Sequence, residues 1–267
     1  MMSIAPHIDP RSPDFPGDPS EQRPFGLVES LRSVLAWSVG IPHLAAWTAF
    51  VVAVDRVSDT RRVDRALKLL SRAVPALAGI RVEVRGRDAI DAHGTYVYVA
   101  NHVNLFDIFV IYQAIPHYTR SLEAADHFDW PLFGPLITAA GQIPVDPEDR
   151  LVTARGLRKA AQMLSLGDSL VVLPEGQRTL DGSVGRFYPG AFRLAIQAGV
   201  PVVPIAIRGG RAINRRGDWR VRPGRTEVIF GAPVSTRELR TRDAAGLANR
   251  CRSIVIDLLQ GRRGPGG

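Results

Sequence analysis

Residues Tyr96 to Asp107 read Tyr-Val-Tyr-Val-Ala-Asn-His-Val-Asn-Leu-Phe-Asp, and the expected fold can be built outward from them. The β-branched and aromatic residues from Tyr96 to Val99 predict a short buried strand. Asn101 is a residue type that favours helix N-caps, and the apolar residues after it predict a buried helix. We therefore expect His102 to lie at a turn from a strand into a helix.

His102 and Asp107 are five positions apart, about one and a half turns of a helix at roughly 3.6 residues per turn. The carboxylate can therefore fold back toward the imidazole. A carboxylate bonded to one imidazole nitrogen fixes the tautomer and leaves the other nitrogen basic, as deprotonation of a hydroxyl near neutral pH requires. A capping Asn, a surface His and an ordinary helix Asp would give the same letters, so the pair alone does not establish a catalytic site.

The composition is typical of a globular protein with anionic partners. The 267 residues can form one large α/β domain with an appendage, and 45% of them are hydrophobic. Lys and Arg outnumber Asp and Glu by 34 to 26, which predicts a phosphate-bearing substrate, an anionic membrane surface or nucleic acid as partner. Aromatic residues make up only 7% and do not alternate with basic ones, which argues against a single-stranded nucleic-acid platform.

Cys251 is the only cysteine, so a reducing compartment is the simpler expectation. Its helical spacing with Leu247 and Val255 predicts a thiol packed in the core. The sequence contains no Walker loop, dinucleotide fingerprint or zinc-ligand cluster. We therefore expect no cofactor and no bound metal.

Three segments precede the expected catalytic domain at residues 80–267. Residues 1–24 contain six prolines and no apolar periodicity, which predicts a disordered tail without a secretory signal. Residues 25–79 form the expected membrane-associated part, in which Val34 to Val54 is 21 residues long without a formal charge. Gly40 and Pro42 in its middle favour a break into two short helices that enter and leave one leaflet. A full span and a soluble core helix are the alternatives.

Asp55 to Arg72 predicts a basic amphipathic helix, either on an anionic membrane surface or packed on the domain. Beyond it, strand and helix patterns alternate, which predicts an α/β fold with a mixed, mostly parallel central sheet flanked by helices. The expected strands and helices fall at residues 80–84, 120–128, 130–140, 141–146, 151–166, 169–173, 191–197, 200–208 and 226–230. The helix at 130–140 suits either an acyl-binding wall or core packing.

A second polar cluster follows the expected strand from Ser169 to Leu173, where Glu175, Gly176 and Arg178 come in quick succession. Ligands bind at the carboxyl ends of strands in open α/β sheets, so this loop is expected on the same rim as His102. Arg178 is suited to bidentate phosphate recognition. Glu175 could hold that arginine or accept a substrate hydroxyl, and a surface salt bridge in a turn is the alternative. The arginine-dense residues 208–225 suit membrane contact and a solvated loop equally.

Four ordered stretches resemble the motifs of the glycerolipid acyltransferases typified by 1-acylglycerol-3-phosphate O-acyltransferase. Asn101 to Asp107 matches the Asn-His-x4-Asp block of that family, and Pro174 to Arg178 resembles its Glu-Gly-x-Arg block. Gly141 to Asp146 is similar to the second block, and Val200 to Pro204 to the late proline block. The matches keep the order of the family and span residues 80–232.

The resemblance implies a glycerol-3-phosphate acyltransferase-like fold and a reaction. An acyl group would pass directly from acyl-CoA or acyl carrier protein to a hydroxyl of lysophosphatidate, at the cytoplasmic face of a membrane. His102 would be the general base, oriented by Asp107, and a backbone N–H in the first turn of the helix after Asn101 would hold the oxyanion. Substrate binding would fall to Asn101, Glu175, Gly176, Arg178, Arg150, Arg186 and Pro204, with Arg178 on the phosphate and Pro204 shaping the acyl pocket. The membrane-embedded two-helix start of many members agrees with a monotopic or single-span N-terminal anchor here.

Two departures from the family pattern leave the acceptor open. Pro147 stands where the second block usually has an arginine, with Arg150 the nearest substitute. Tyr188 and Pro189 replace the lysines of a Phe-Lys-Lys-Gly run, with Arg186 nearby. A lyso-aminolipid or glycolipid acceptor is therefore an alternative, and a silent lipid-binding module is another. A nucleic-acid binder rests on charge alone and ranks last, so no nucleic acid is expected as partner.

Overall fold

The computed structural model describes residues 24–57, 60–146 and 148–262. The predicted disordered tail therefore lies, apart from Pro24, outside the described residues. The strands are β1 (Ile80–Arg85), β2 (Val97–Ala100), β3 (Thr119–Ala124), β4 (Ile143–Val145), β5 (Ser169–Val172), β6 (Val202–Arg208) and β7 (Gly224–Phe230). The helices are α2 (Leu27–Val57), α3 (Thr60–Leu77), α4 (Asp107–Ala114), α5 (Phe133–Ala139), α6 (Arg150–Ser165), α7 (Gly190–Ala198), α8 (Gly210–Ile213) and α9 (Ala244–Leu259), with short 3-10 turns η1 (Arg87–Ala89), η2 (Ala125–Asp129) and η3 (Thr241–Asp243).

Strand β2 lies at the centre of the sheet that the described strands form, in the order β1-β7-β6-β2-β5-β3-β4. It is parallel to both neighbours, β5 and β6, and all of its residues are buried, as expected for a parallel strand covered on both faces. Strands β3 and β4 continue the parallel part, whereas β7 runs antiparallel to β6. The predicted α/β fold with a mixed, mostly parallel sheet is confirmed.

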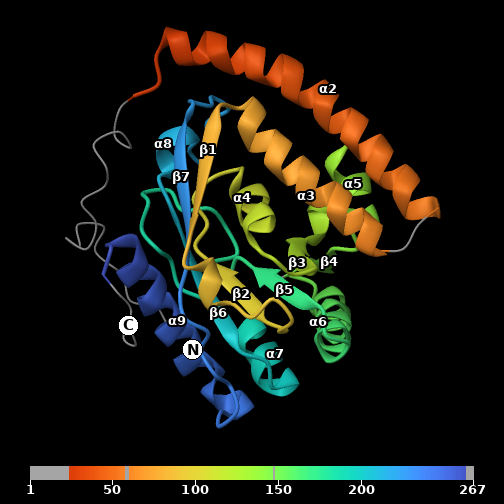
Figure 1. The fold of residues 1–267 in the computed structure, drawn as a ribbon, viewed down its shortest axis with the longest axis vertical. Helices are drawn as coiled ribbons and strands as arrows, with labels where there is room; N and C mark the ends of the chain where they lie inside the picture. The colour runs from red at the N-terminus through yellow and green to blue at the C-terminus, as the bar shows by residue number, and fades with distance from the viewer. Residues whose placement is uncertain (1–23, 58–59, 147, 263–267) are drawn as a thin grey trace.

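Helices cover both faces of the sheet (Figure 1). Alternate residues of β2 divide between the two cores: Val97 and Val99 pack toward α7 and α9, and Tyr98 packs toward α4. Cys251 of α9 lies in the first core with no exposed surface, and burial raises the pKa of its thiol to about 12. The thiol is therefore protonated and packed, as the spacing of the helix predicts.

Helices α2 and α3 lie side by side at one end of the molecule, with α2 outermost (Figure 1). The expected break near Gly40 and Pro42 is wrong, because α2 continues through both residues. Contacts on either side of Pro42 hold the helix in one piece. Ser33 bonds to Val221 on one side, and Thr48 bonds to the carbonyl of Leu132 on the other, at 3.2 Å. The predicted basic helix at 55–72 is also divided, since residues 55–57 end α2 and residues 60–72 belong to α3, with residues 58–59 outside the described part of the chain.

Among the described helices, α2 is long and apolar enough to cross a membrane by length and composition. Only 11% of its most apolar window is buried in the protein. Its large apolar side chains that face solvent are Leu27, Val28, Leu31, Val34, Leu35, Val39, Ile41, Phe50 and Val57. A soluble core helix, one of the alternatives for this segment, would bury such side chains, and α2 does not.

The carboxyl ends of β2, β5 and β6 meet at one edge of the sheet because the three strands are parallel. The loops that leave this edge carry Asn101 to Asp107, Pro174 to Arg178, and Gly209 onward. The parallel arrangement of the strands therefore brings the blocks Asn101 to Asp107 and Pro174 to Arg178 to the same rim of the sheet.

Candidate active site

The imidazole of His102 and the carboxylate of Asp107 are in direct contact. Nδ1 of His102 lies 2.7 Å from Oδ2 of Asp107, and the aspartate side chain has no exposed surface, whereas 22% of the histidine side chain is exposed. A carboxylate oxygen can only accept, so Nδ1 carries the proton and Nε2 is the free basic nitrogen. The buried acid thus fixes the tautomer of a base that faces solvent.

Asp107 is held by the turn that it closes. Its Oδ2 also accepts from the backbone N–H groups of Val103, at 2.6 Å, and Asn104, at 2.9 Å. Both N–H groups lie just before α4, close to the first helical turn in which we expected a backbone donor for the oxyanion. The structure uses these two to fix the aspartate, so that donor would have to be another N–H group.

Asn104 shapes the turn, a role that its sequence pattern did not predict. Its side-chain oxygen accepts from the N–H of Phe106 at 2.7 Å, and its amide donates to the carbonyl of Gly210 at 2.8 Å. The first bond is a local turn that Asn forms readily, and it delays the start of α4 until Asp107. The Asn itself is the local signal for this turn, because its side chain readily accepts from the backbone N–H two residues on.

Asn101 does not cap the helix, contrary to the expectation from its residue type. Its amide donates to the carbonyl of Ile207 at 3.0 Å, and its oxygen accepts from the N–H of Ile207 at 2.8 Å. The side chain offers the same donor and acceptor as a peptide group, so it extends the pairing of β2 with β6 by one position. The strand therefore runs on to the edge where His102 leaves the sheet.

Glu175 fixes the backbone on both sides of the site. Its Oε1 accepts from the N–H of His102 at 2.8 Å, and its Oε2 accepts from the N–H of Gly185 at 2.7 Å. Burial raises the pKa of Glu175, and the two N–H groups oppose that rise. The N–H of Thr179 donates to the carbonyl of His102 at 2.8 Å, so the loop after β5 holds both polar groups of the His102 peptide.

Arg178 comes directly before Thr179 and is therefore close to His102 along this loop. Within the described parts of the chain, its half-buried guanidinium has no hydrogen bond or ion pair, including none to Glu175. It lies near enough to His127 to oppose the rise in the pKa of that imidazole, which the hydrogen bond to Glu123 causes. Gly176 takes a left-handed conformation, with φ of 71°, that lets the loop turn back.

The remaining predicted residues are placed differently. Arg186 is exposed. It directly follows Gly185, whose N–H donates to the carboxylate of Glu175. Arg150 is the exposed first residue of α6. Pro204 is buried with Ile254 and Leu258 of α9, around Gly231, on the face of the sheet opposite α4. No described contact joins Arg150 or Pro204 to His102, and Pro147 lies outside the described residues.

An apolar hollow of about 40 Å³ lies between α3, α4 and α5. Its walls include Ile108 and Phe109, the two residues after Asp107, together with Phe133, Leu136 and Ile137 of α5. The helix predicted at 130–140 therefore contributes a wall to a hollow that is also lined by the residues directly after Asp107.

Comparison with known proteins gives a match to a family model, two similar sequences and one similar solved structure. Residues 81–208 match a family model described as Acyltransferase. The 1-acyl-sn-glycerol-3-phosphate acyltransferase alpha of Ovis aries is 31% identical over 195 residues, which cover 73% of this chain and 68% of the sheep protein. The 1-acyl-sn-glycerol-3-phosphate acyltransferase of Limnanthes alba is 29% identical over 213 residues, which cover 79% of this chain and 72% of the plant protein.

Among solved structures, the crystal structure of the 1-acyl-sn-glycerophosphate (LPA) acyltransferase PlsC from Thermotoga maritima is similar, with a TM-score of 0.75. The alignment covers 88% of this chain and 96% of that one, at 21% identity. At this identity the likeness establishes the shared fold. It covers nearly the whole of the other protein.

Proposed function

The chain belongs to the 1-acyl-sn-glycerol-3-phosphate acyltransferase family, and on that premise we propose that it acylates the free hydroxyl of lysophosphatidate, from acyl-CoA or acyl carrier protein, in phospholipid biosynthesis. It is an acyltransferase. The observation that carries the finer proposal is the 2.7 Å contact between His102 and Asp107, on a peptide held by Glu175 and Thr179.

The reaction is a direct transfer with His102 as the base. Nε2 takes the proton of the acceptor hydroxyl while the hydroxyl oxygen attacks the thioester carbonyl. The C–O bond forms, the tetrahedral intermediate collapses, and the C–S bond breaks. The imidazolium then returns the proton to the departing thiolate, so no charge or proton is left over. Asp107 stabilises the imidazolium while it exists.

The two substrates have separate places in this proposal. Arg178 holds the acceptor phosphate, because its guanidinium is unpaired among the described residues and stands on the loop beside His102. Arg186 adds positive charge at the same rim. The apolar hollow between α3, α4 and α5 receives the start of the acyl chain in this proposal, because Ile108 and Phe109 in its wall directly follow Asp107.

The exposed apolar side of α2 supports our proposal that the enzyme works on a membrane, where a lipid acceptor is found. We assign the active site to the cytoplasmic face because acyl-CoA and acyl carrier protein are cytoplasmic donors. The anchor lies in the membrane as one helix rather than as two short ones.

The function is tested by incubating the purified protein with labelled acyl-CoA and a panel of lysophosphatidate, glycerol 3-phosphate and lyso-aminolipids. We expect product with lysophosphatidate. His102→Ala should lower turnover by at least about 1,000-fold while folding and vesicle binding stay normal. His93→Ala, which changes an exposed histidine before β2, is the matched control and should be fully active. Near-normal turnover in His102→Ala would refute the mechanism.

A lyso-aminolipid acceptor is the second candidate, and a specific feature favours it. Tyr188, 60% exposed, stands where the family pattern has a lysine that suits a phosphate. Labelling of the aminolipid and not of lysophosphatidate would select this candidate. Labelling of no acceptor would indicate a non-catalytic lipid-binding module.

A further inference from the structure

The segment from Arg211 to Arg222, here called the arginine loop, connects β6 to β7 and reaches the loop that carries Arg178. Nη1 of Arg216 donates to the carbonyl of Arg178 at 3.0 Å. Nη2 of Arg211 donates to the carbonyl of Leu180 at 2.9 Å. These two carbonyls flank Thr179, whose N–H bonds to His102. Arginine side chains thus fix the main chain on both sides of the residue that contacts the catalytic peptide.

Hydrogen bonds within the arginine loop fix its conformation. The side-chain amide of Asn214 donates to the carbonyls of Asp218, at 2.8 Å, and Arg220, at 3.0 Å. The guanidinium of Arg220 bonds to the carboxylate of Asp218, with the shortest contact at 2.8 Å. These hydrogen bonds within the loop restrict its backbone, so the loop can hold Arg216 in a fixed position.

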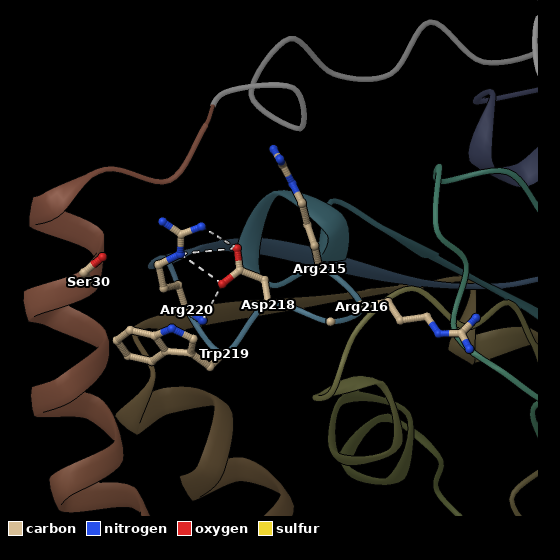
Figure 2. Close-up of a pocket in the computed structure, with 7 residues that line it drawn as sticks. Ser30, Arg215, Arg216, Asp218, Trp219 and Arg220 are labelled. Atoms are coloured by element: carbon tan, nitrogen blue, oxygen red, sulfur yellow. Dashed lines mark hydrogen bonds and ion pairs between the residues drawn. The ribbon is translucent and has the colours of Figure 1, made fainter.

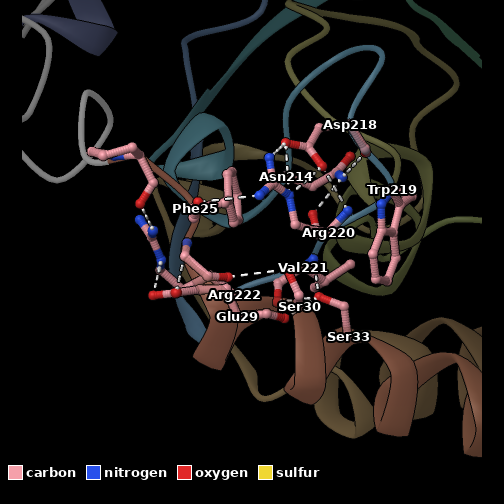
Figure 3. Close-up of polar contacts among 12 residues, drawn as sticks. Phe25, Glu29, Ser30, Ser33, Asn214, Asp218, Trp219, Arg220, Val221 and Arg222 are labelled. Atoms are coloured by element: carbon pink, nitrogen blue, oxygen red, sulfur yellow. Dashed lines mark hydrogen bonds and ion pairs between the residues drawn. The ribbon is translucent and has the colours of Figure 1, made fainter.

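The loop is also held from outside by α2 (Figure 3). The N–H of Val221 donates to the Oγ of Ser33 at 2.8 Å, and the indole N–H of Trp37 donates to the carbonyl of Trp219 at 2.8 Å. The guanidinium of Arg220 donates to the carbonyl of Phe25 at 3.1 Å. The arginine loop therefore lies between α2 and the Arg178 loop and contacts both.

An open hollow of about 500 Å³ lies between Ser30 and this loop, and its arginines suggest an anion site at first sight (Figure 2). Their arrangement argues against that. Arg220 is neutralised by Asp218, and Figure 2 shows Arg215 and Arg216 pointing away from one another. Guanidinium groups that diverge do not enclose one anion, so the contact of Arg216 with the Arg178 loop is the informative feature.

We infer that Arg216 is a positioning residue for the acceptor site, and that it acts by fixing the main chain of Arg178 through its bond to that carbonyl. The inference rests on the proposed role of Arg178 in holding the acceptor phosphate. A guanidinium that donates to a carbonyl makes a charge-assisted hydrogen bond. Without it, residues 178–180 can shift, and the Arg178 guanidinium no longer meets the phosphate in the productive geometry. The affinity for the acceptor falls, and that for the acyl donor does not.

The test measures steady-state kinetics on the full-length enzyme, with lysophosphatidate and acyl-CoA varied in turn. Arg216→Ala should raise the KM for lysophosphatidate about 3- to 10-fold and leave the KM for acyl-CoA unchanged. Arg216→Met, which keeps the aliphatic stem, should give the same result and serves if the Ala variant is unstable. Arg216→Lys, which keeps a charged donor, should come back to within about 2-fold of the unsubstituted enzyme. Arg215→Ala removes the neighbouring charge of the same loop and should change neither KM.

A double-mutant cycle then asks whether Arg216 acts through Arg178. Arg178→Ala alone should raise the KM for lysophosphatidate more than Arg216→Ala does. In the Arg178→Ala background, removal of Arg216 should add less than about 1.5-fold. Full additivity, or an Arg216→Ala variant no different from Arg215→Ala, would overturn the inference and leave the role of Arg178 standing. A normal acceptor KM in Arg178→Ala would overturn both.

Discussion

The two carboxylate oxygens of Asp107 differ in their hydrogen bonds. Oδ2 accepts from His102, Val103 and Asn104, whereas Oδ1 is buried and has no hydrogen-bond partner among the described residues. An amide in place of the carboxylate can therefore put its oxygen at the Oδ2 position and its NH₂ at the Oδ1 position. The geometry and the tautomer of His102 survive that exchange, but the negative charge does not.

Asp107→Asn therefore separates the charge of this residue from its geometry. We expect kcat to fall about 100- to 10,000-fold, because the imidazolium formed during transfer loses its counter-charge. The measurement is kcat at saturating lysophosphatidate, with the circular dichroism spectrum as the check on folding. A loss smaller than about 5-fold would mean that Asp107 only orients the ring.

The contact between His102 and Asp107 could be predicted from the sequence, because their spacing of five residues is local information. The roles of these two residues and of Arg178 stay predictions. The roles of Asn101 and Glu175 could not be predicted. The partner of Asn101 is Ile207 and a partner of Glu175 is His102, and both are distant in the chain. The parallel pairing of β2 with β6 and β5 brings them together. Glu175 was expected to hold Arg178 or a substrate hydroxyl, and both of its oxygens are instead bonded to backbone N–H groups.

At the scale of elements, β2 is tied to the loop after α4 by a neutral histidine. Nε2 of His117 lies 2.7 Å from the carbonyl of Asp91, which can only accept, so Nε2 carries the proton. Nδ1 is then the acceptor for the hydroxyl of Tyr98, at 2.5 Å. Burial lowers the pKa of His117, and the charges of Lys68 and His93 lower it further, whereas Asp91 opposes them.

This arrangement predicts a pH dependence of stability. The unfolded chain takes up a proton on His117 near pH 6.5, and the folded chain does so only at lower pH, so the free energy of unfolding falls as the pH drops below about 6.5. His117→Gln can make both bonds and does not titrate. Between pH 7.5 and 5.5, urea unfolding should show a larger loss in the unsubstituted protein than in His117→Gln, by at most about 1.4 kcal/mol per pH unit. Equal losses in the two proteins would contradict the assignment.

The prediction of a break in the apolar segment was wrong because of the contacts that α2 makes with neighbouring elements. Pro42 removes one N–H and favours a kink when a helix stands alone. Here the helix has partners on both sides of the proline, α3 and α5 after it and the arginine loop before it. The proline is visible in the local sequence, but those contacts with distant residues are not. The apolar pattern of β2 is local, and its bounds were predicted within one residue.

The exposed side of α2 gives a prediction about membrane binding. Leu35 is 67% exposed on α2, and Leu166 is 75% exposed just after α6. Leu35→Asp should weaken binding to vesicles that contain anionic lipid about 5-fold or more, because a charge would have to enter the apolar part of the membrane. Leu166→Asp removes the same apolar group elsewhere on the surface and should bind normally. Equal binding of both variants in a flotation assay would place the membrane contact on another surface.

At the scale of the whole molecule, the segment outside the sheet and the catalytic rim are joined through one loop. The N-terminal half of α2 bonds to residues 219–221, and residues 211 and 216 of the same loop bond to the carbonyls beside Thr179. A helix suited to a membrane is thereby connected, through two sets of hydrogen bonds, to the peptide of His102. Because of this connection, we expect that removing a hydrogen bond between α2 and the arginine loop lowers the affinity of the acceptor site.

Ser33→Ala tests this connection at its most buried point. The Ser33 side chain has no exposed surface, and its Oγ accepts from the N–H of Val221 at 2.8 Å. Its one hydroxyl hydrogen is within reach of the carbonyls of Glu29, at 2.6 Å, and Val221, at 3.1 Å. Loss of the hydroxyl leaves the N–H of Val221 without its partner in a buried place, which should lower the free energy of unfolding by about 1–3 kcal/mol. If the arginine loop carries the effect onward, the KM for lysophosphatidate should also rise about 2- to 3-fold, with an unchanged KM for acyl-CoA. Ser38→Ala, which removes only a bond to the carbonyl of Val34 in the same helix, is the control and should change neither quantity. Lower stability with a normal acceptor KM in Ser33→Ala would show that α2 stabilises the fold without influencing the site.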